Sequence, residues 1–350
     1  MNGYTTFYCF KIQQSNAPFR CQKGVANNHT VLSKSLMISH MLTQAREMSW
    51  KAFGKSIIFF LPGIFCYNGI FGRYPAISIT GSQCALQCDH CQGKILEPMI
   101  SVMTPDLLIE KCVRLSERGN HGVLISGGCD EKGRLPWEKF IQAIKKVKEL
   151  TSLYISVHSG LIEYEKALRL KEAGVDQALI DVIGDDDTYR DIYHVDFGVS
   201  EIMSSMESLQ KANLPIIPHI VCGLHYGKIK GEKKAIEMIA QFDVEQVVIV
   251  SLMRILGTPV ETVKSPSAEE VAEIIAETRF KFPEAQISLG CARERGNTRM
   301  ELLAIDAGVN RMVIPSEAAI RRAEDYGLEI RYQRTCCSVS KDFSGQEWQS

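Results

Sequence analysis

Three cysteines with short, regular spacing give the sequence its clearest chemical signal. Cys84, Cys88 and Cys91 follow the pattern C-x3-C-x2-C and lie between Gly81 and Gly93. Three thiolates can hold three irons of a [4Fe–4S] cube and leave the fourth iron open. An open iron can bind the amino and carboxylate groups of S-adenosylmethionine (SAM), and an electron passed into the sulfonium then yields a 5′-deoxyadenosyl radical. Two alternatives stay open: three small apolar residues on one helix face, and a zinc site, which usually has a fourth protein ligand.

A pair of glycines follows a predicted strand over residues 122–126. In Ser126-Gly127-Gly128, the two glycines would let the backbone approach a ligand closely. Carbonyl groups exposed there could hold the ammonium group of SAM. A simple tight turn is the alternative.

Carboxylate and imidazole side chains lie at or near the ends of further predicted strands. Asp181 could accept the ribose hydroxyls of SAM, whereas the run Asp185–Asp187 is more typical of a solvated loop that caps the next helix. His158 ends one strand and His219 lies inside another. Each histidine is either a hydrogen-bonded core residue or part of the site.

A second set of cysteines lies far along the chain. Cys291 ends a predicted strand, and Cys336 and Cys337 are adjacent, where a disulfide would be strained and rare. If the C-terminal residues fold over the site, the three thiolates could hold an auxiliary [4Fe–4S] cluster, with Arg293 as a further ligand or a charge partner. Such a cluster is a plausible sulfur source, which a rearranging or methylating enzyme would not need. The alternative is three unrelated thiols.

These residues must be positioned by a regular alternation of elements. Apolar, β-branched runs alternate with amphipathic segments, which indicates a parallel sheet covered on both faces. Eight such units predict an α/β fold of the (βα)8 TIM-barrel type, with a doubly wound open sheet as the alternative. In a barrel, chemistry is located on the loops that follow the strands. The predicted strands are 76–80, 122–126, 153–158, 177–183, 216–222, 246–252, 286–290 and 311–314.

The sequence divides into four predicted parts. Residues 1–40 are expected to be an extension outside the fold, disordered or following a misplaced start, because no acidic residue occurs before Glu47. A transit peptide is the alternative. Residues 41–74 are predicted to form a helix and a covering segment, residues 75–330 the barrel, and residues 331–350 a tail that carries Cys336 and Cys337.

The composition narrows the class of protein. The 350 residues are 45% hydrophobic and 23% charged, as in ordinary globular proteins, and the formal net charge is −1. This charge gives no electrostatic case for nucleic acid or an anionic membrane, and no apolar stretch is long enough to span a bilayer. Twelve unevenly clustered cysteines favour metal ligation in a reducing compartment, so a cytoplasmic protein is expected.

Longer segments around these motifs resemble a known family. They are similar to the biotin synthase homologues of the radical SAM superfamily, and most to the second protein of the two-component, archaeal-type lipoyl synthase. The segments that carry the resemblance are Tyr74–Gly81 with the cysteine motif, Leu124–Gly128, Ala178–Asp185, Pro218–Gly227, Leu289–Arg293 and Cys336-Cys337.

The resemblance implies a radical SAM barrel that acts as a sulfurtransferase in lipoate biosynthesis. Sulfur would be inserted into an unactivated C–H bond of an octanoyl chain on a lipoyl-carrier protein. A sister radical SAM lipoyl synthase protein and a low-potential electron donor would be partners. The alternatives are a radical SAM enzyme that acts on a small molecule, as biotin synthase does, and a non-catalytic iron–sulfur subunit.

The resemblance also assigns positions within the site. His90 takes the place of a ring that flanks the adenine of SAM, and Gly223-Leu224 take the place of the segment that lies along it. The resemblance supports the second cysteine trio as ligands of the auxiliary cluster. Cys129 stands where an acid is often found, and Cys222 where an aliphatic residue is expected.

Overall fold

The computed structural model describes residues 28–63, 65–67 and 69–344. All eight predicted strands are present, with bounds that differ by no more than two residues from those predicted. They are β4 (Ala76–Ser78), β6 (Gly122–Ser126), β7 (Tyr154–His158), β8 (Gln177–Asp181), β9 (Ile216–Cys222), β10 (Gln246–Ser251), β11 (Gln286–Leu289) and β12 (Arg311–Val313).

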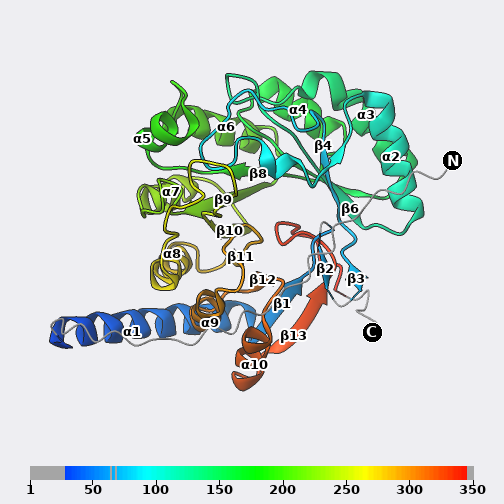
Figure 1. Cartoon of the computed structure of the whole chain (residues 1–350). Helices are drawn as coiled ribbons and strands as arrows, with labels where there is room; N and C mark the ends of the chain where they lie inside the picture. The colour runs from blue at the N-terminus through cyan, green and yellow to red at the C-terminus, as the bar shows by residue number, and fades with distance from the viewer. Residues whose placement is uncertain (1–27, 64, 68, 345–350) are drawn as a thin grey trace.

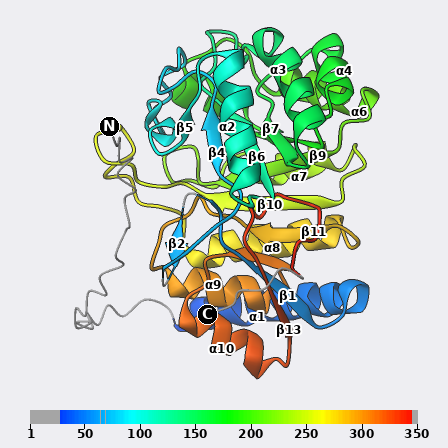
Figure 2. The ribbon, with the colours of Figure 1, turned by 90° about the vertical axis from the view of Figure 1, so that its right-hand side faces the viewer.

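Three further strands extend the same sheet. They are β1 (Ser56–Phe60), β5 (Ile100–Ser101) and β13 (Glu329–Gln333), and the order is β13-β1-β12-β11-β10-β9-β8-β7-β6-β4-β5. Each neighbouring pair in this order is parallel. The sheet curls into an open barrel with helices on its outer face, so the predicted fold class is confirmed (Figures 1 and 2). A short antiparallel pair, β2 (Cys66–Tyr67) and β3 (Ile70–Phe71), lies outside this sheet.

Residues that cap the first turn mark the starts of several helices. In α2 (Pro105–Glu117) the side chain of Thr104 accepts a hydrogen bond from Leu107 N, and Pro105 occupies the first turn, where its missing N–H costs nothing. Ser267 caps α8 (Ala268–Lys281) in the same way. The other helices are α1 (Asn28–Phe53), α3 (Trp137–Leu150), α4 (Tyr164–Glu172), α5 (Asp186–Thr188), α6 (Val199–Lys211), α7 (Glu232–Ile239), α9 (Thr298–Asp306) and α10 (Glu317–Asp325), with a 3₁₀ turn η1 (Lys94–Leu96) and a π turn η2 (Tyr189–Tyr193).

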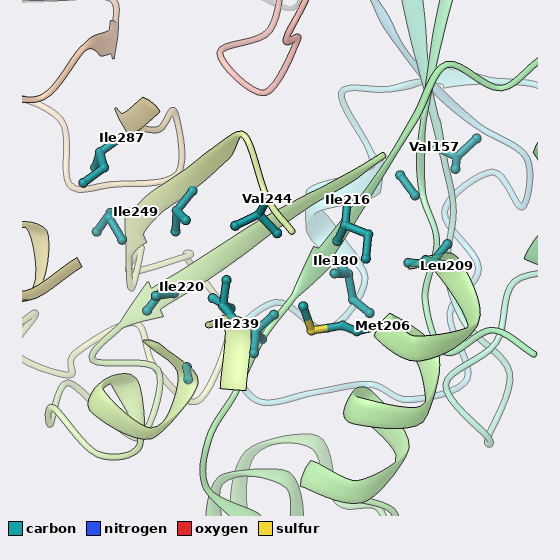
Figure 3. Packing of buried hydrophobic residues seen from close by; sticks show 14 of the residues in the cluster. Val157, Ile180, Met206, Leu209, Ile216, Ile220, Ile239, Val244, Ile249 and Ile287 are labelled. Carbon is teal, nitrogen blue, oxygen red and sulfur yellow. The ribbon is translucent and has the colours of Figure 1, made fainter. Parts of the chain in front are cut away.

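Alternation along the strands divides the apolar residues between two cores. Ile180 and Ile249 point outward and pack against helices, as Figure 3 shows for Ile180 beside Met206 of α6. Leu179 and Val248, one position away, point to the inner face. The inner core consists of Ile58, Phe60, Leu179, Ile217, Val248, Val250, Val313 and Cys337.

The chain after β13 turns back along the inner face of the sheet (Figure 1). We call residues 334–344 the C-terminal segment. Gln246 Nε2 donates to Cys337 O and Gln177 Nε2 donates to Ser338 O, both at 2.6 Å, and Arg311 donates to Val339 O at 2.6 Å. These three donors are the first residues of β10, β8 and β12. The segment therefore fills the inside of the open barrel.

The structure changes two of the predicted domain boundaries. Helix α1 begins at Asn28, so residues 28–40 are helical and continuous with the rest of α1. The sheet includes β1 and β13, so it reaches beyond residues 75–330 on both sides. Residues 1–27 lie outside the described residues. Among the residues that are described, no helix has both the length and the apolar character needed to cross a membrane.

Candidate cofactor site

The loop after β4 carries the first cysteine trio. Between Gly81 and Gly93 the backbone forms turns and no α-helix, so the alternative of three cysteines on a helix face is wrong. Cys91 N and Gln92 N donate to Cys88 O, and Gln92 has a positive φ of 47°. We call residues 81–93 the cluster loop.

The three thiols line one pocket of about 150 Å³. Cys88 and Cys91 are 4% and 6% exposed, and Cys84 is half-buried. Among the described residues, no three or more His, Cys, Asp or Glu side chains are placed so that together they could hold a single metal ion. In a cube, by contrast, each thiolate binds a different iron.

The donor set suits an iron–sulfur cluster. Burial, and then the neighbouring Cys91, raises the pKa of Cys88 far above its ordinary value, and burial raises the pKa of Cys91 to about 11. These thiols are protonated without metal, and iron would replace their protons. The Nδ1 atom of His90 is buried in the same pocket without a hydrogen-bond partner. The buried, protonated thiols and the unpaired nitrogen of His90 both fit a pocket that binds a cofactor.

The glycine pair after β6 has a structural reason that the sequence did not reveal. A Cβ on Gly128 would lie 2.0 Å from Gln83 O and 2.6 Å from Cys84 Cα. Gly128 therefore lets two backbones touch, and its N–H donates to Thr80 Oγ1 at 2.7 Å. Ser126 O accepts from Ile79 N in the sheet. Gly127 and Gly128 line the pocket, so they stay the candidates for contacting SAM.

A half-buried carboxylate and two histidines, His90 and His158, line the same pocket, and the ring of a third histidine, His219, lies beside that of His158. Asp181 Oδ1 lies 3.5 Å from His158 Nε2, and the His158 and His219 rings are 6.0 Å apart. Although burial opposes ionisation, His158 holds the pKa of Asp181 at about 2, and Asp181 raises the pKa of His158. Burial lowers the pKa values of His219 and His90 to about 4. One ion pair therefore lies beside two neutral imidazoles.

The second cysteine trio also comes together. Cys291 and Cys336 border the inner core and Cys337 is 2% exposed within it. Burial, and then Cys336, raises the pKa of Cys291 to about 11, whereas hydrogen bonds from Cys337 and Ser338 lower the pKa of Cys336 to about 6. The charge of His158, which lines the pocket, also lowers the pKa of Cys336.

Arg293 was predicted to be a cluster ligand or a charge partner, and its charge does lower the pKa of Cys291. Its side chain is 1% exposed, forms an ion pair of 2.7 Å with Glu301, and donates to Gly290 O and Val313 O. These contacts occupy the guanidinium, so the prediction that Arg293 is a cluster ligand is wrong. A different arginine, Arg311, contacts the C-terminal segment through its carbonyl groups.

Gly223 and Leu224 do not line the pocket. Leu224 is 4% exposed and packs in the outer core, while Gly223 N donates to Glu232 Oε1 at 2.7 Å. Gly223 has a φ of +73°, and a Cβ there would lie 2.6 Å from Pro266 Cδ. The predicted contact of this segment with adenine stays a prediction.

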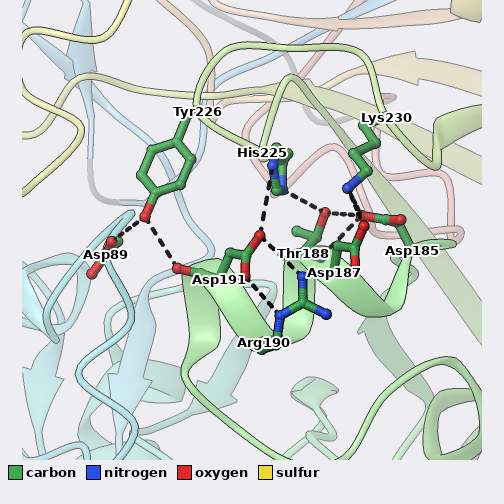
Figure 4. Close-up of polar contacts among 9 residues, drawn as sticks. All are labelled: Asp89, Asp185, Asp187, Thr188, Arg190, Asp191, His225, Tyr226 and Lys230. Carbon is green, nitrogen blue, oxygen red and sulfur yellow. Dashed lines mark hydrogen bonds and ion pairs between the residues drawn. The ribbon is translucent and has the colours of Figure 1, made fainter.

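A polar network that the sequence analysis missed holds the loops together (Figure 4). Asp89, inside the cluster loop, accepts from Tyr226 Oη at 2.6 Å and lies 2.7 Å from His194 Nε2. Asp185 caps α5 through Thr188 N, and Lys230 pairs with Asp185 and Asp187. The acidic run is therefore a capped, ion-paired loop, as its sequence indicated.

Comparisons with known proteins agree with this geometry. A model of the radical SAM superfamily matches residues 78–242, and a model of the biotin and thiamin synthesis associated domain matches residues 249–348. A biotin synthase of Coxiella burnetii is 29% identical over 242 residues, which are 67% of this chain and 74% of the relative. A biotin synthase of Geotalea uraniireducens is 24% identical over 250 residues, covering 68% and 73%.

Solved structures show the same fold. Methylornithine synthase superposes with a TM-score of 0.60 at 19% identity, covering 86% of this chain and 92% of that one. HydG, a maturase of the [FeFe]-hydrogenase, gives a TM-score of 0.61 at 14% identity, covering 88% and 70%. At these identities the likeness concerns the fold alone.

Proposed function

Because the chain belongs to the radical SAM superfamily, in a group like biotin synthase, we propose that this radical SAM enzyme inserts sulfur into an unactivated C–H bond. Cys84, Cys88 and Cys91 would hold the [4Fe–4S] cluster that binds SAM. Cys291, Cys336 and Cys337 would hold an auxiliary cluster. When bound, the two groups would supply an electron for the cleavage of SAM and a sulfide for the substrate radical, with an external low-potential donor returning electrons.

One observation carries the proposal: the C-terminal segment places two cysteines against the inner face of the sheet, beside Cys291. Gln177 and Gln246 each donate at 2.6 Å to the carbonyl groups around Cys337. These hydrogen bonds bring Cys336 and Cys337 to the inner core that Cys291 also borders. One member of the trio, Cys336, also interacts electrostatically with His158, which lines the pocket of the first trio.

The remaining residues in and around the pocket would bind SAM and exclude water. The carboxylate of Asp181, ionised beside His158, can accept hydroxyl groups of a ribose. Next to His158, and outside the lining of the pocket, His219 Nδ1 lies 3.0 Å from Ile217 O; with the proton on Nδ1, the Nε2 lone pair of His219 is available as an acceptor. Apolar side chains, among them Leu96 and Ile183, complete the walls and keep water from a reactive radical.

Two substrate classes fit this chemistry. The biotin synthases among the relatives support a small molecule as the substrate. The sequence segments that resemble lipoyl synthase, Cys336-Cys337 among them, support the second candidate, an octanoyl chain on a lipoyl-carrier protein, with a sister radical SAM protein as partner.

The first experiment counts clusters. Anaerobic reconstitution of the whole chain is expected to give about two [4Fe–4S] clusters. Cys291→Ala should remove the auxiliary cluster and leave the first one. Cys112→Ala, which changes a thiol of α2 that is buried in the outer core, is the matched control and should retain both. A Cys291→Ala protein with the full iron content would contradict the auxiliary site.

The second experiment identifies the substrate class. The reconstituted enzyme is incubated with SAM, a reductant and an octanoylated carrier peptide, and the peptide is weighed by mass spectrometry. A gain of sulfur supports the carrier-bound substrate. An unchanged peptide together with 5′-deoxyadenosine points to a small molecule, and the absence of 5′-deoxyadenosine from a fully loaded protein would overturn the catalytic role.

A further inference from the structure

A fourth thiol, that of Cys129, lies at the cluster loop, and the function proposed above does not use it. We propose that Cys129 binds the fourth iron of the radical SAM cluster while SAM is absent, and that SAM displaces it. In this exchange the bond between iron and the Cys129 sulfur breaks and the bonds to the amino nitrogen and carboxylate oxygen of SAM form. The ammonium group of SAM gives up a proton when its nitrogen binds iron, the released thiolate takes up a proton, and no electron is transferred.

The backbone holds Cys129 against the cluster loop from two sides. Ala85 N donates to Cys129 O at 2.8 Å, and the preceding Gly128 donates to Thr80 Oγ1 at 2.7 Å. Gly128 is so close to the loop that an added Cβ would lie 2.6 Å from both Cys84 Cα and Cys84 Cβ. Residue 129 is therefore fixed directly beside the first cysteine of the trio.

Cys129 borders the same pocket as the trio. Cys129 lines the pocket of about 150 Å³ together with Cys84, Cys88 and Cys91. A Cβ placed on Gly160, which also lines this pocket, would lie 3.7 Å from Cys129 Sγ. Cys129 and Cys84 also line an outer hollow of about 640 Å³, so both lie in the wall between the pocket and the surface.

The neighbouring acidic residue is already engaged. One carboxylate oxygen of Asp130 accepts from Lys132 N and Arg134 N, each at 2.9 Å, and so closes a turn. Cys129 is the residue after Gly128 whose side chain is left to face the pocket. Four thiolates are the common ligand set of a [4Fe–4S] cluster, so a fourth thiol beside three ligands completes it.

Cys129 and SAM would bind the fourth iron with different strength. Cys129 would offer one bond to iron, whereas SAM offers two from one molecule, so a chelating SAM can replace a single thiolate. A cube with four thiolates has no open iron to lose. The exchange would therefore protect the cluster until the cosubstrate arrives.

The test compares reconstituted wild-type protein with Cys129→Ala and Cys129→Ser, and uses Cys112→Ala as the control. Mild oxidation without SAM should leave the cube intact in wild type and in the control. In Cys129→Ala the fourth iron should be lost, which electron paramagnetic resonance detects as a [3Fe–4S] signal. Because no thiolate competes, Cys129→Ala should also bind SAM several-fold more tightly. Cys129→Ser should lie between the two.

Equal iron content before oxidation shows that the variants assemble both clusters, and the auxiliary cluster contributes equally to all of them. Equal [3Fe–4S] signals and equal SAM affinities in wild type and Cys129→Ala would overturn the proposal and leave Cys129 as a wall residue. This test depends only on the SAM-binding cluster. Its outcome is independent of whether sulfur is inserted, because no substrate is present.

Discussion

The hydroxyl group of Tyr226 donates a hydrogen bond of 2.6 Å to the carboxylate of Asp89, the residue between Cys88 and His90. The same hydroxyl lies 3.1 Å from Asp191 O. Tyr226 follows β9, and Asp191 belongs to η2, so one side chain joins the loop after β9 to the cluster loop and to η2, both of which line the pocket (Figure 4). Tyr226 has a φ of 48°, which the network must stabilise.

Tyr226→Phe is expected to loosen the cluster loop without creating a cavity. Loss of a hydrogen bond to a partly exposed carboxylate should lower the free energy of unfolding by about 1 kcal/mol. SAM affinity should fall as well, because the loop that carries the cluster is less firmly held. Denaturant unfolding and SAM titration measure the two effects. Tyr164→Phe, on the distant helix α4, is the matched control, and a variant indistinguishable from it would show that Tyr226 does not hold the loop.

Gly128→Ala should be far more damaging than Gly127→Ala. At position 128 the new Cβ would lie 2.0 Å from Gln83 O, whereas at position 127 its nearest contact, Thr80 Oγ1, is at 3.1 Å. The first substitution must displace the cluster loop, at a cost of about 1–3 kcal/mol, and should reduce iron incorporation. Iron content after reconstitution tests this order. Equal iron content in the two variants would contradict the close backbone contact.

Gln177→Leu keeps the volume of the side chain and removes its polar contacts to the C-terminal segment. Ser338 O loses its donor at 2.6 Å, and Ser340 N loses its acceptor at 3.0 Å. Buried groups left without partners should cost about 1–3 kcal/mol of folding free energy. Amide hydrogen exchange at Ser340 should accelerate, while Gln210→Leu on the exposed face of α6 should leave it unchanged. Unchanged exchange in both proteins would mean that other contacts hold the segment.

The stability of the cluster-free, reduced protein should fall between pH 6.5 and about 4. Burial, helped by Arg73 and Arg334, lowers the pKa of His121 from 6.5 to about 4. Between these pH values His121 is protonated in the unfolded chain but stays neutral in the folded protein. Lower pH therefore favours unfolding. The contribution is fully present above pH 6.5. Denaturant midpoints on both sides of the window should differ less for His121→Phe than for wild type, and an equal difference would contradict this assignment.

The strands that the sequence predicted are those whose burial is encoded locally. Each of the eight is a short apolar run bounded by turn residues, and a buried parallel strand needs no other signal. Strand β1 is also such a run, but its place between β12 and β13 depends on partners about 250 residues away. Strand β13 is an edge strand of mixed polarity, EIRYQ, which has little pattern of its own.

The candidate site likewise has features that the local sequence encodes and features that depend on distant partners. The spacing of Cys84, Cys88 and Cys91 is local, and parallel strands bring their ends to one edge, so His158 and Asp181 could be expected there. Tyr226 and Glu232 were missed because their partners, Asp89 and Gly223 N, lie on backbone whose path a motif does not specify. Polar residues at the starts of otherwise apolar strands, Gln177 and Gln246, were the one signal that pointed to a buried segment.

The C-terminal segment also sets an order of events during synthesis. Gln177 and Ser340, which bond to each other, are separated by 163 residues, so every strand leaves the ribosome before the residues that fill the barrel. The residues of the cluster loop and Cys129 emerge early and can meet at once. A cluster on Cys291, Cys336 and Cys337 can be assembled only on a nearly finished chain. A ribosome stalled shortly before residue 336 would therefore carry a chain able to bind the first cluster and not the second.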